Sequence, residues 1–215
     1  MVHLLSEKNS IINQFIAELR NVDTQNDRMR FRRNLERIGE IAAIEISKTL
    51  PYKMQEVTTP LGIANVSLPA EQPVVGTILR AGLPLHQGIL NYFDHADNAF
   101  ISAYRKHHKD GTFDIRLDYV SSPSLNGRIL ILADPMLATG SSIVTTYKAI
   151  LERGKPKHTH IVAAVGSIQG VEYVKKHMPV EVDIWIGAID EELTAQAYIV
   201  PGLGDAGDLA YGEKE

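Results

Sequence analysis

Hydroxyl, glycine and carboxylate residues gather between an apolar run and a helical segment in the middle of the chain. The run "RILILA" at 128–133 leads into Asp134, then into the turn residues Thr139 to Ser142, and then into the helical pattern "SIVTTYKAILERG". Backbone N–H groups at a helix N-terminus, with hydroxyls beside them and a glycine that permits close approach, bind phosphate. The P-loop pattern G-x-x-x-x-G-K-[ST] is not met. The stretch therefore predicts a cup for a monophosphate rather than a nucleoside triphosphate site.

A second glycine-rich stretch, "PGLGDAGD" at 201–208, carries two carboxylates and spells G-x-G-x-x-G. In a dinucleotide-binding turn this pattern follows a first strand, opens a helix and precedes an acidic residue roughly 20 positions further on. Only eight residues follow Gly207 in this sequence. They do not supply the helix, the next strand and the acid, so we expect a loop with a different use.

The histidines do not show the spacing of a metal-binding motif. The pairs His107-His108 and His158-x-His160 lack the i, i+4 spacing of zinc-binding histidines and the acid between them, so we expect these residues to be structural or exposed. The chain has no cysteine, which excludes disulfides, thiolate catalysis and cysteine-bound zinc.

Length and composition place the chain among globular proteins. Its 215 residues are 44% hydrophobic and 22% charged, which fits a single α/β domain spanning 1–215. We expect no membrane span, because no apolar run approaches about 18 residues. The charged pair Glu7-Lys8 stands where a signal peptide needs apolar residues, so we expect a cytoplasmic protein.

The net charge of -4 argues against binding to nucleic acid through a general basic field. Five arginines do cluster, interspersed with Glu36 and Glu40. They are Arg28, Arg30, Arg32, Arg33 and Arg37. We interpret them as a solvated helix face or a subunit interface, and a basic docking surface is the alternative.

The elements that must position these groups follow from apolar periodicity. Residues 10–50 show helical spacing with a break at "NVDTQ", which predicts two helices with Asp23 or Thr24 as the N-cap of the second. Two short extended segments flank the turn at Pro60-Leu61-Gly62. Residues 106–120 predict a β-hairpin arm that turns at Asp110-Gly111.

Beyond Pro73, short apolar strands alternate with helices. The strands are expected at 74–79, 99–105, 128–133, 159–167 and 182–189. This alternation predicts the α/β class, with a central, mostly parallel sheet and helices on both faces. Ligands of such sheets bind beyond the carboxyl ends of the strands, which is where Asp134 and the cup fall.

Leu130 to Ser142, "LILADPMLATGSS", resembles the phosphoribosyl-diphosphate loop of the type I phosphoribosyltransferases. The form "DPMLATG" is characteristic of the uracil phosphoribosyltransferases, although that branch usually has glycine where this chain has Ser141. The segments "ILRAGL" (78–83), "AYR" (103–105) and "YIVPGLGDAGD" (198–208) are similar to the family's diphosphate loop, second arginine strand and uracil loop. The resemblance covers Val74 to Asp208 and implies a small base-binding hood built from the terminal segments.

The reaction implied by the resemblance joins N1 of uracil to C1 of 5-phosphoribosyl 1-diphosphate, giving UMP and diphosphate in pyrimidine salvage. The implied residues for phosphoribosyl diphosphate are Arg80, Arg105, Asp134, Pro135, Met136, Leu137, Ala138, Thr139, Gly140, Ser141, Ser142 and Asp205. Those for uracil are Ile199, Gly204, Asp205 and Ala206. Asp134, Asp205 and Arg105 are the implied catalytic residues, with Asp205 as the candidate acceptor of the N1 proton.

The implied cofactor is Mg²⁺, held mainly by the diphosphate and by water rather than by protein ligands. We expect uracil and phosphoribosyl diphosphate as substrates, a homodimer or higher homo-oligomer, and neither membrane nor nucleic acid as a partner. Two alternatives stay open at this point. One is a regulator with this fold that binds RNA through the arginine cluster, and the other is a phosphoribosyltransferase for another nucleobase.

Overall fold

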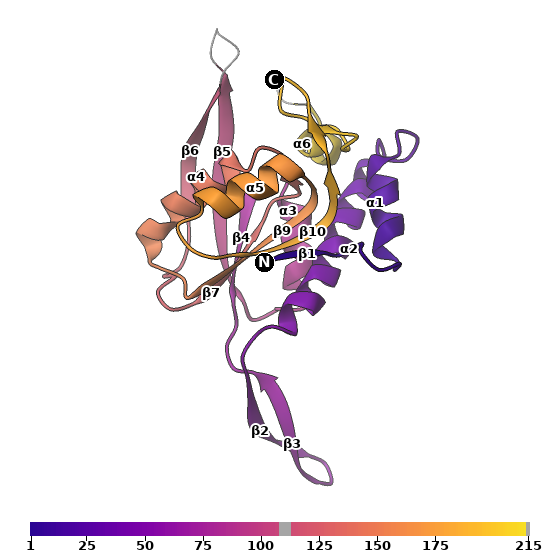
Figure 1. Ribbon diagram of the computed structural model, residues 1–215. Helices are drawn as coiled ribbons and strands as arrows, with labels where there is room; N and C mark the ends of the chain where they lie inside the picture. Colours follow the sequence, from indigo (N-terminus) through magenta and orange to yellow (C-terminus); the bar gives the residue numbers. More distant parts are fainter. Residues whose placement is uncertain (108–112, 214–215) are drawn as a thin grey trace.

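The computed structural model describes residues 1–107 and 113–213, and at 103–107 and 113–117 it describes the backbone alone. Its main sheet has the strand order β1-β10-β9-β7-β4-β5-β6, with the short β8 also paired to β9. The strands are β1 (Val2–Leu4), β4 (Val74–Leu79), β5 (Asp97–His107), β6 (Phe113–Ser121), β7 (Ile129–Ala133), β8 (Met136–Leu137), β9 (His158–Ser167) and β10 (Asp183–Asp190). All pairs are parallel except β5 with β6 (Figure 1), which confirms the predicted fold class.

Helices cover both faces of this sheet (Figure 1). On one face lie α1 (Ile12–Arg20), α2 (Arg28–Ser47) and α3 (Leu83–Leu90), and on the other lie α4 (Ser141–Ile150), α5 (Ile168–His177) and the 3-10 turn η1 (Leu151–Arg153). Side chains alternate between the faces along each strand, so Val75 joins the core under α2 while its neighbour Val74 joins the core under α4. Two apolar cores therefore share one sheet.

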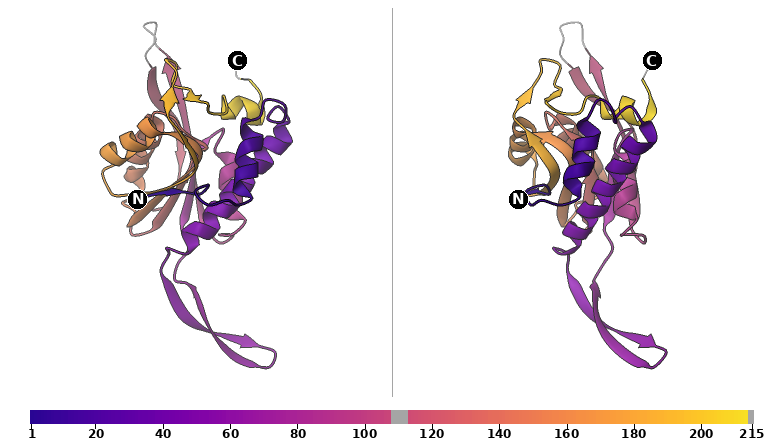
Figure 2. Two further views of the ribbon diagram at one scale, coloured as in Figure 1. Left: turned by 45° about the vertical axis from the view of Figure 1, so that its right-hand side comes forward. Right: turned by 90° about the vertical axis from the view of Figure 1, so that its right-hand side faces the viewer.

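A two-stranded hairpin projects from the body at the end opposite to α6 (Figures 1 and 2). It is formed by β2 (Tyr52–Thr59) and β3 (Gly62–Pro69), as the two extended segments around Pro60 predicted. Most of its residues are exposed on both faces. Its large exposed apolar side chains are Tyr52, Met54, Val57, Leu61, Ile63 and Val66.

The hairpin predicted at 106–120 is confirmed as the antiparallel pair β5 and β6, while its expected turn at Asp110-Gly111 lies outside the described residues. The predicted N-cap of the second helix was wrong. Asp27 caps α2, since its side chain accepts from the backbone N–H of Arg30 at 3.0 Å. The Thr24 hydroxyl instead donates to the carbonyl of Glu18 in α1.

The C-terminal segment lies over the carboxyl ends of the parallel strands (Figure 2). It contains the short antiparallel pair β11 (Glu192–Leu193) and β12 (Ile199–Val200), followed by α6 (Ala206–Tyr211). Helix α6 is tied to α2 by Arg32, whose Nη1 donates to the Ala210 carbonyl at 2.7 Å. This arrangement places the glycine-rich loop beside the sheet edge at which the phosphate cup begins.

Candidate active site

The predicted phosphate cup begins where β7 ends. The backbone N–H of Asp134 continues the pairing with β9 by donating to the Val162 carbonyl at 3.0 Å, and the Asp134 carboxylate accepts from the Met136 N–H at 3.3 Å. Gly140 has a left-handed φ of +75° and immediately precedes α4. The first N–H groups of a helix have no acceptor within it, and here the Ser141 N–H donates to the Thr139 hydroxyl at 3.4 Å. An anion at this helix end would take the place of that long bond.

The cup is fixed from the side of α5. The Ser167 hydroxyl donates to the Ala138 carbonyl at 2.6 Å and accepts from the Gly170 N–H at 2.9 Å. A Cβ atom on Gly140 would lie 2.7 Å from the Gly170 carbonyl oxygen, so only glycine fits this contact. Within the cup, the hydroxyls of Thr139 and Ser141 are 2.7 Å apart and share a hydrogen bond. Ser141 thus takes part in the hydrogen bonding of the cup.

Arg80, the first predicted arginine, follows β4 and reaches the C-terminal segment. Its Nη2 donates to the Asp208 carboxylate and to the Gly212 carbonyl, both at 3.1 Å. The second predicted arginine, Arg105, lies in β5 with its backbone paired to Ile115. Its side chain belongs to the part that the structure does not describe, so its role stays a prediction.

Residues 199–206, here called the base loop, contain two glycines and several buried apolar side chains. The side chains of Ile199 and Ala206 are buried, and Gly204 has a φ of +94°. Asp205 caps α6, because its Oδ1 accepts from the N–H groups of Gly207 at 2.8 Å and Asp208 at 3.0 Å. The loop borders a pocket of about 380 Å³ lined by Gln25, Asn26, Arg28, Gly204, Asp205, Asp208, Leu209 and Glu213.

Two residues of this region were missed by the sequence analysis. Arg20, the last residue of α1, makes a two-pronged ion pair with Asp190, the last residue of β10, at 2.8 Å for each bond. Asp190 also accepts from the Gly202 N–H at 2.9 Å. The available signal was the place of Asp190 at the carboxyl end of a predicted strand, where ligand sites of such sheets gather.

Comparison with known sequences identifies the family. A sequence model described as Uracil phosphoribosyltransferase matches residues 6–213. A protein of that name from Porphyromonas gingivalis is 54% identical over 214 residues, which cover 100% of this chain and 99% of that protein. Another of the same name from Pyrococcus furiosus is 36% identical over 210 residues, covering 96% of this chain and 88% of that protein. The chain belongs to the uracil phosphoribosyltransferase family.

Solved structures share the fold of this chain. A protein from Aquifex aeolicus superposes with a TM-score of 0.88 at 30% identity, covering 99% of this chain and 98% of that one. An adenine phosphoribosyl transferase from Trypanosoma brucei, at 10% identity and a TM-score of 0.58 over 87% of this chain and 83% of its own, shows the shared fold alone. Membership of the family confirms the predicted enzyme class and favours it over the RNA-binding regulator and the transferase for another base.

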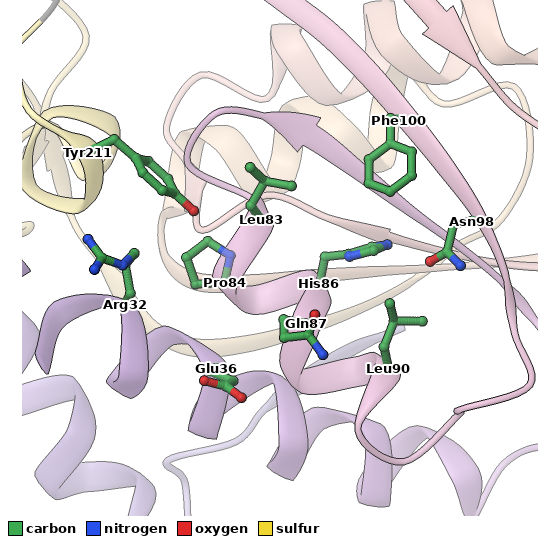
Figure 3. Close-up of a pocket in the computed structure, with 10 residues that line it drawn as sticks. All are labelled: Arg32, Glu36, Leu83, Pro84, His86, Gln87, Leu90, Asn98, Phe100 and Tyr211. Atoms are coloured by element: carbon green, nitrogen blue, oxygen red, sulfur yellow. The ribbon is translucent and has the colours of Figure 1, made fainter. Parts of the chain in front are cut away.

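A further pocket, of about 440 Å³, lies between α2, α3, β5 and α6 (Figure 3). Its lining residues are Arg32, Glu36, Leu83, Pro84, His86, Gln87, Leu90, Asn98, Phe100 and Tyr211, none of which was predicted for the site. The His86 ring points toward Asn98, and burial lowers the pKa of His86 below its ordinary value. None of the lining residues belongs to the cup or to the base loop, so this pocket is separate from both.

Histidines gather at the opposite, amino ends of β9 and β10. Ligand atoms of His158, His160 and Asp183 lie within 4.8 Å of one another, a spacing that suits a metal. However, the Trp185 indole donates to His160 Nδ1 at 3.1 Å, so the neutral ring carries its proton on Nε2. Asp183 accepts from His158 at 2.8 Å and from His3 at 3.0 Å. These hydrogen bonds tie the amino ends of β1, β9 and β10 together, and the prediction that the histidines are structural or exposed stays a prediction.

Among the described residues, the structure contains no helix that is both long and apolar enough to cross a membrane. The cytoplasmic location stays a prediction.

Proposed function

We propose that the protein transfers the phosphoribosyl group of phosphoribosyl diphosphate to N1 of uracil through the residues of the cup, Arg80 and the base loop. The observation that carries this proposal is the contact between Arg80 and Asp208, which joins the arginine after β4 to the segment that follows the base loop. The proposed diphosphate site and the proposed uracil site must lie side by side, because N1 of uracil must reach C1 of the ribose.

The 5-phosphate is proposed to anchor phosphoribosyl diphosphate in the cup. The N–H groups of Ser141 and Ser142 and the hydroxyls of Thr139 and Ser141 would donate to the phosphate at the positive end of the α4 dipole. These contacts would replace the bonds that Thr139 and Ser141 make with each other. The cup residues proposed to surround the phosphate are Pro135, Met136, Leu137, Ala138, Thr139, Gly140, Ser141 and Ser142. Met136 and Leu137 pair with β9, which supports a cup that is rigid before the substrate arrives.

The diphosphate leaves as the C1–O bond breaks, and negative charge gathers on it. Arg80 and Arg105 are proposed to neutralise that charge, because a guanidinium binds phosphate oxygens with two parallel hydrogen bonds. The donor set also fits Mg²⁺, which prefers one or two carboxylates together with substrate phosphates. Asp205 would hold the ion through a water, and the bound ion would neutralise diphosphate oxygens.

Asp134 is proposed to bind the ribose hydroxyls and to stabilise positive charge on the sugar as the bond to diphosphate lengthens. The lone pair of N1 then forms the new bond to C1, and the N1 proton leaves toward Asp205. Backbone groups of Ile199, Gly204 and Ala206 are proposed to read the two carbonyls and the N3–H of uracil. Cytosine carries an amino group in place of one carbonyl, so a donor aimed there stays unpaired.

The test is release of diphosphate by the purified protein with Mg²⁺ and phosphoribosyl diphosphate, with uracil, cytosine, orotate, hypoxanthine and adenine offered separately. Turnover with uracil alone is expected. An Asp134→Asn variant should lose most turnover, whereas Asp97→Asn, at the amino end of β5, is the matched control and should retain it. Turnover with another base only would refute the proposed role of the base loop.

We also propose that the whole chain acts as one phosphoribosyltransferase domain within a homo-oligomer. The family match over 6–213 and the sheet shared by both cores support the single domain. The β2–β3 hairpin supports the oligomer, because an isolated two-stranded hairpin is marginally stable in water and this one exposes six large apolar side chains: Tyr52, Met54, Val57, Leu61, Ile63 and Val66.

A further inference from the structure

The shape of the base loop bears directly on its proposed use. Its contacts with uracil are proposed to come from the main chain, and it contains Gly202 and Gly204, both with positive φ. Glycine has the widest backbone freedom of any residue, so a glycine-rich loop is ordered only by contacts from outside it. A displacement of about 1 Å in a positioning group can cost roughly 100-fold in rate, so those outside contacts bear on function.

One partly buried ion pair supplies such a contact. Asp190 is 8% exposed and uses both carboxylate oxygens, since Oδ1 accepts from Arg20 Nη2 at 2.8 Å and Oδ2 accepts from Arg20 Nη1 at 2.8 Å. Its Oδ2 also accepts from the Gly202 N–H at 2.9 Å. Arg20 Nη1 in turn donates to the Gly202 carbonyl at 3.1 Å. Both backbone polar groups of Gly202 are therefore bound to the same ion pair.

The turn at Gly202 admits only glycine. Its φ of +57° is left-handed, and a Cβ atom there would lie 2.0 Å from the Ile199 carbonyl oxygen. The next residue is held by Gln25, whose Nε2 donates to the Leu203 carbonyl at 3.4 Å. Helix α1, strand β10 and the α1–α2 connection thus converge on the middle of the base loop.

We propose that Arg20 and Asp190 are positioning residues for uracil, acting through the two backbone groups of Gly202 and without contact with either substrate. The inference rests on the proposed function. The cup depends on other contacts, those of Ala138 with Ser167 and of Gly140 with Gly170. Loss of the Arg20–Asp190 pair should therefore weaken use of uracil far more than use of phosphoribosyl diphosphate, whose proposed contacts include only Asp205 from the base loop.

The test compares Asp190→Asn and Arg20→Lys with wild type. The Asp190→Asn change retains an acceptor for the Gly202 N–H but loses the charge, whereas the Arg20→Lys change retains the charge but loses the two-pronged geometry. The expected result is a rise in KM for uracil of roughly 10- to 100-fold, because hydrogen bonds to charged groups are the strong ones. KM for phosphoribosyl diphosphate should stay within about twofold.

The matched controls are Asp97→Asn and Arg128→Lys, which alter an ion pair of the same chemistry at 3.0 Å at the amino ends of β5 and β7. They should leave both KM values unchanged. Amide hydrogen exchange gives a readout independent of turnover, and exchange should quicken at 199–206 in the Asp190 and Arg20 variants but not at 134–142.

The outcomes separate the two proposals. A wild-type chain that does not turn over uracil would overturn the proposed function and the positioning role with it. A wild-type chain that uses uracil, with both variants retaining its KM and its exchange pattern, would overturn the positioning role alone. Equal rises in both KM values, or faster exchange throughout the chain, would show a merely structural ion pair and would also overturn it.

Discussion

The Arg80 guanidinium, which is proposed to bind diphosphate, is held by the Asp208 carboxylate at 3.1 Å, and the two residues come from opposite sides of the site. Asp208 lies in the first turn of α6, directly after the base loop. The carboxylate therefore accepts a hydrogen bond from the same guanidinium that diphosphate oxygens would use, so the two compete for Arg80. Binding of one substrate is thus linked to the segment that carries the loop for the other.

Replacing Asp208 by Asn should tighten binding of phosphoribosyl diphosphate. The pair is partly exposed, at 40% for Arg80 and 33% for Asp208, and such pairs contribute up to about 1 kcal/mol, so the gain should be at most roughly fivefold in Kd. Titration calorimetry without uracil measures it. Glu213→Gln, a nearby acid on the same pocket, is the control for general charge, and weaker binding by the Asp208 variant would contradict the competition.

Replacing Gly202 by Ala should damage uracil use. The new Cβ would meet the Ile199 carbonyl, so the turn must move and the base loop with it. We expect KM for uracil to rise at least about tenfold, as for other losses of loop position. Gly127→Ala is the control, since Gly127 has a similar φ of +68° and nothing within 4 Å of the added atom. Equal kinetics in the two variants would refute a need for glycine at 202.

Replacing Ser167 by Ala should loosen the cup. The hydroxyl caps α5 and donates to the buried Ala138 carbonyl, so its loss should lower the free energy of unfolding by about 2 kcal/mol and raise KM for phosphoribosyl diphosphate. Urea unfolding and initial rates measure both effects. Ser47→Ala, which removes an exposed hydroxyl bonded to the Ile44 carbonyl, should change neither. An unchanged KM in the Ser167 variant would show that the cup does not need this anchor.

The fold was predictable because its signals are local. Alternating buried strands and helices after Pro73 define the sheet, and the cup is one contiguous stretch from Asp134 to Ser142 in which every group lies near its neighbours along the chain. The Asp27 cap was missed for an equally local reason. Asp23, Thr24 and Asp27 all precede the same apolar pattern, and propensity does not choose between caps three residues apart.

The parts that sequence did not predict are contacts between distant segments. Arg20 and Asp190 are separated by 170 residues, and Arg80 and Asp208 by 128. Neither pair has a spacing that periodicity can detect, because their approach depends on how α1, β4 and β10 meet at one edge of the sheet. Asp190 could have been selected by its place at a strand end, but its partner could not.

Substituting Met54 and Ile63 by Lys should break the oligomer into single chains. Both side chains are exposed, at 64% and 68%, and the pairing of Thr58 with Ile63 and of Met54 with Ser67 puts them on one face of the hairpin. We expect at least two chains of 23.8 kDa in the wild type and one in the variant, measured by light scattering. Val22→Lys, exposed but outside the hairpin, is the control, and a monomeric wild type would refute the oligomer.

The histidine network should make stability fall on mild acidification. Burial, aided by the charge of neighbouring His158 and opposed by Asp183, lowers the pKa of His160 from 6.5 to about 4. His3, stacked on Trp185, acts in the same direction as His158. Between pH 6.5 and 4 the unfolded chain therefore binds a proton at His160 that the folded chain does not. The contribution of His160 to the free energy of unfolding is fully present above pH 6.5. It falls by about 3 kcal/mol as the pH decreases toward 4.

Urea unfolding followed by Trp185 fluorescence at pH 7.5, 5.5 and 4.5 measures this loss. His160→Gln removes the titrating ring and keeps an acceptor for the indole, so it should flatten the slope, although buried His86 retains a part of it. The exposed His95→Gln variant should keep the full slope. Below pH 4 the free energy of unfolding should fall a second time as Asp183 is protonated. Burial raises the pKa of Asp183, but hydrogen bonds from His3 and His158 outweigh it and lower the pKa from 3.8 to about 2. A slope that His160→Gln leaves intact would assign the acid sensitivity to another group.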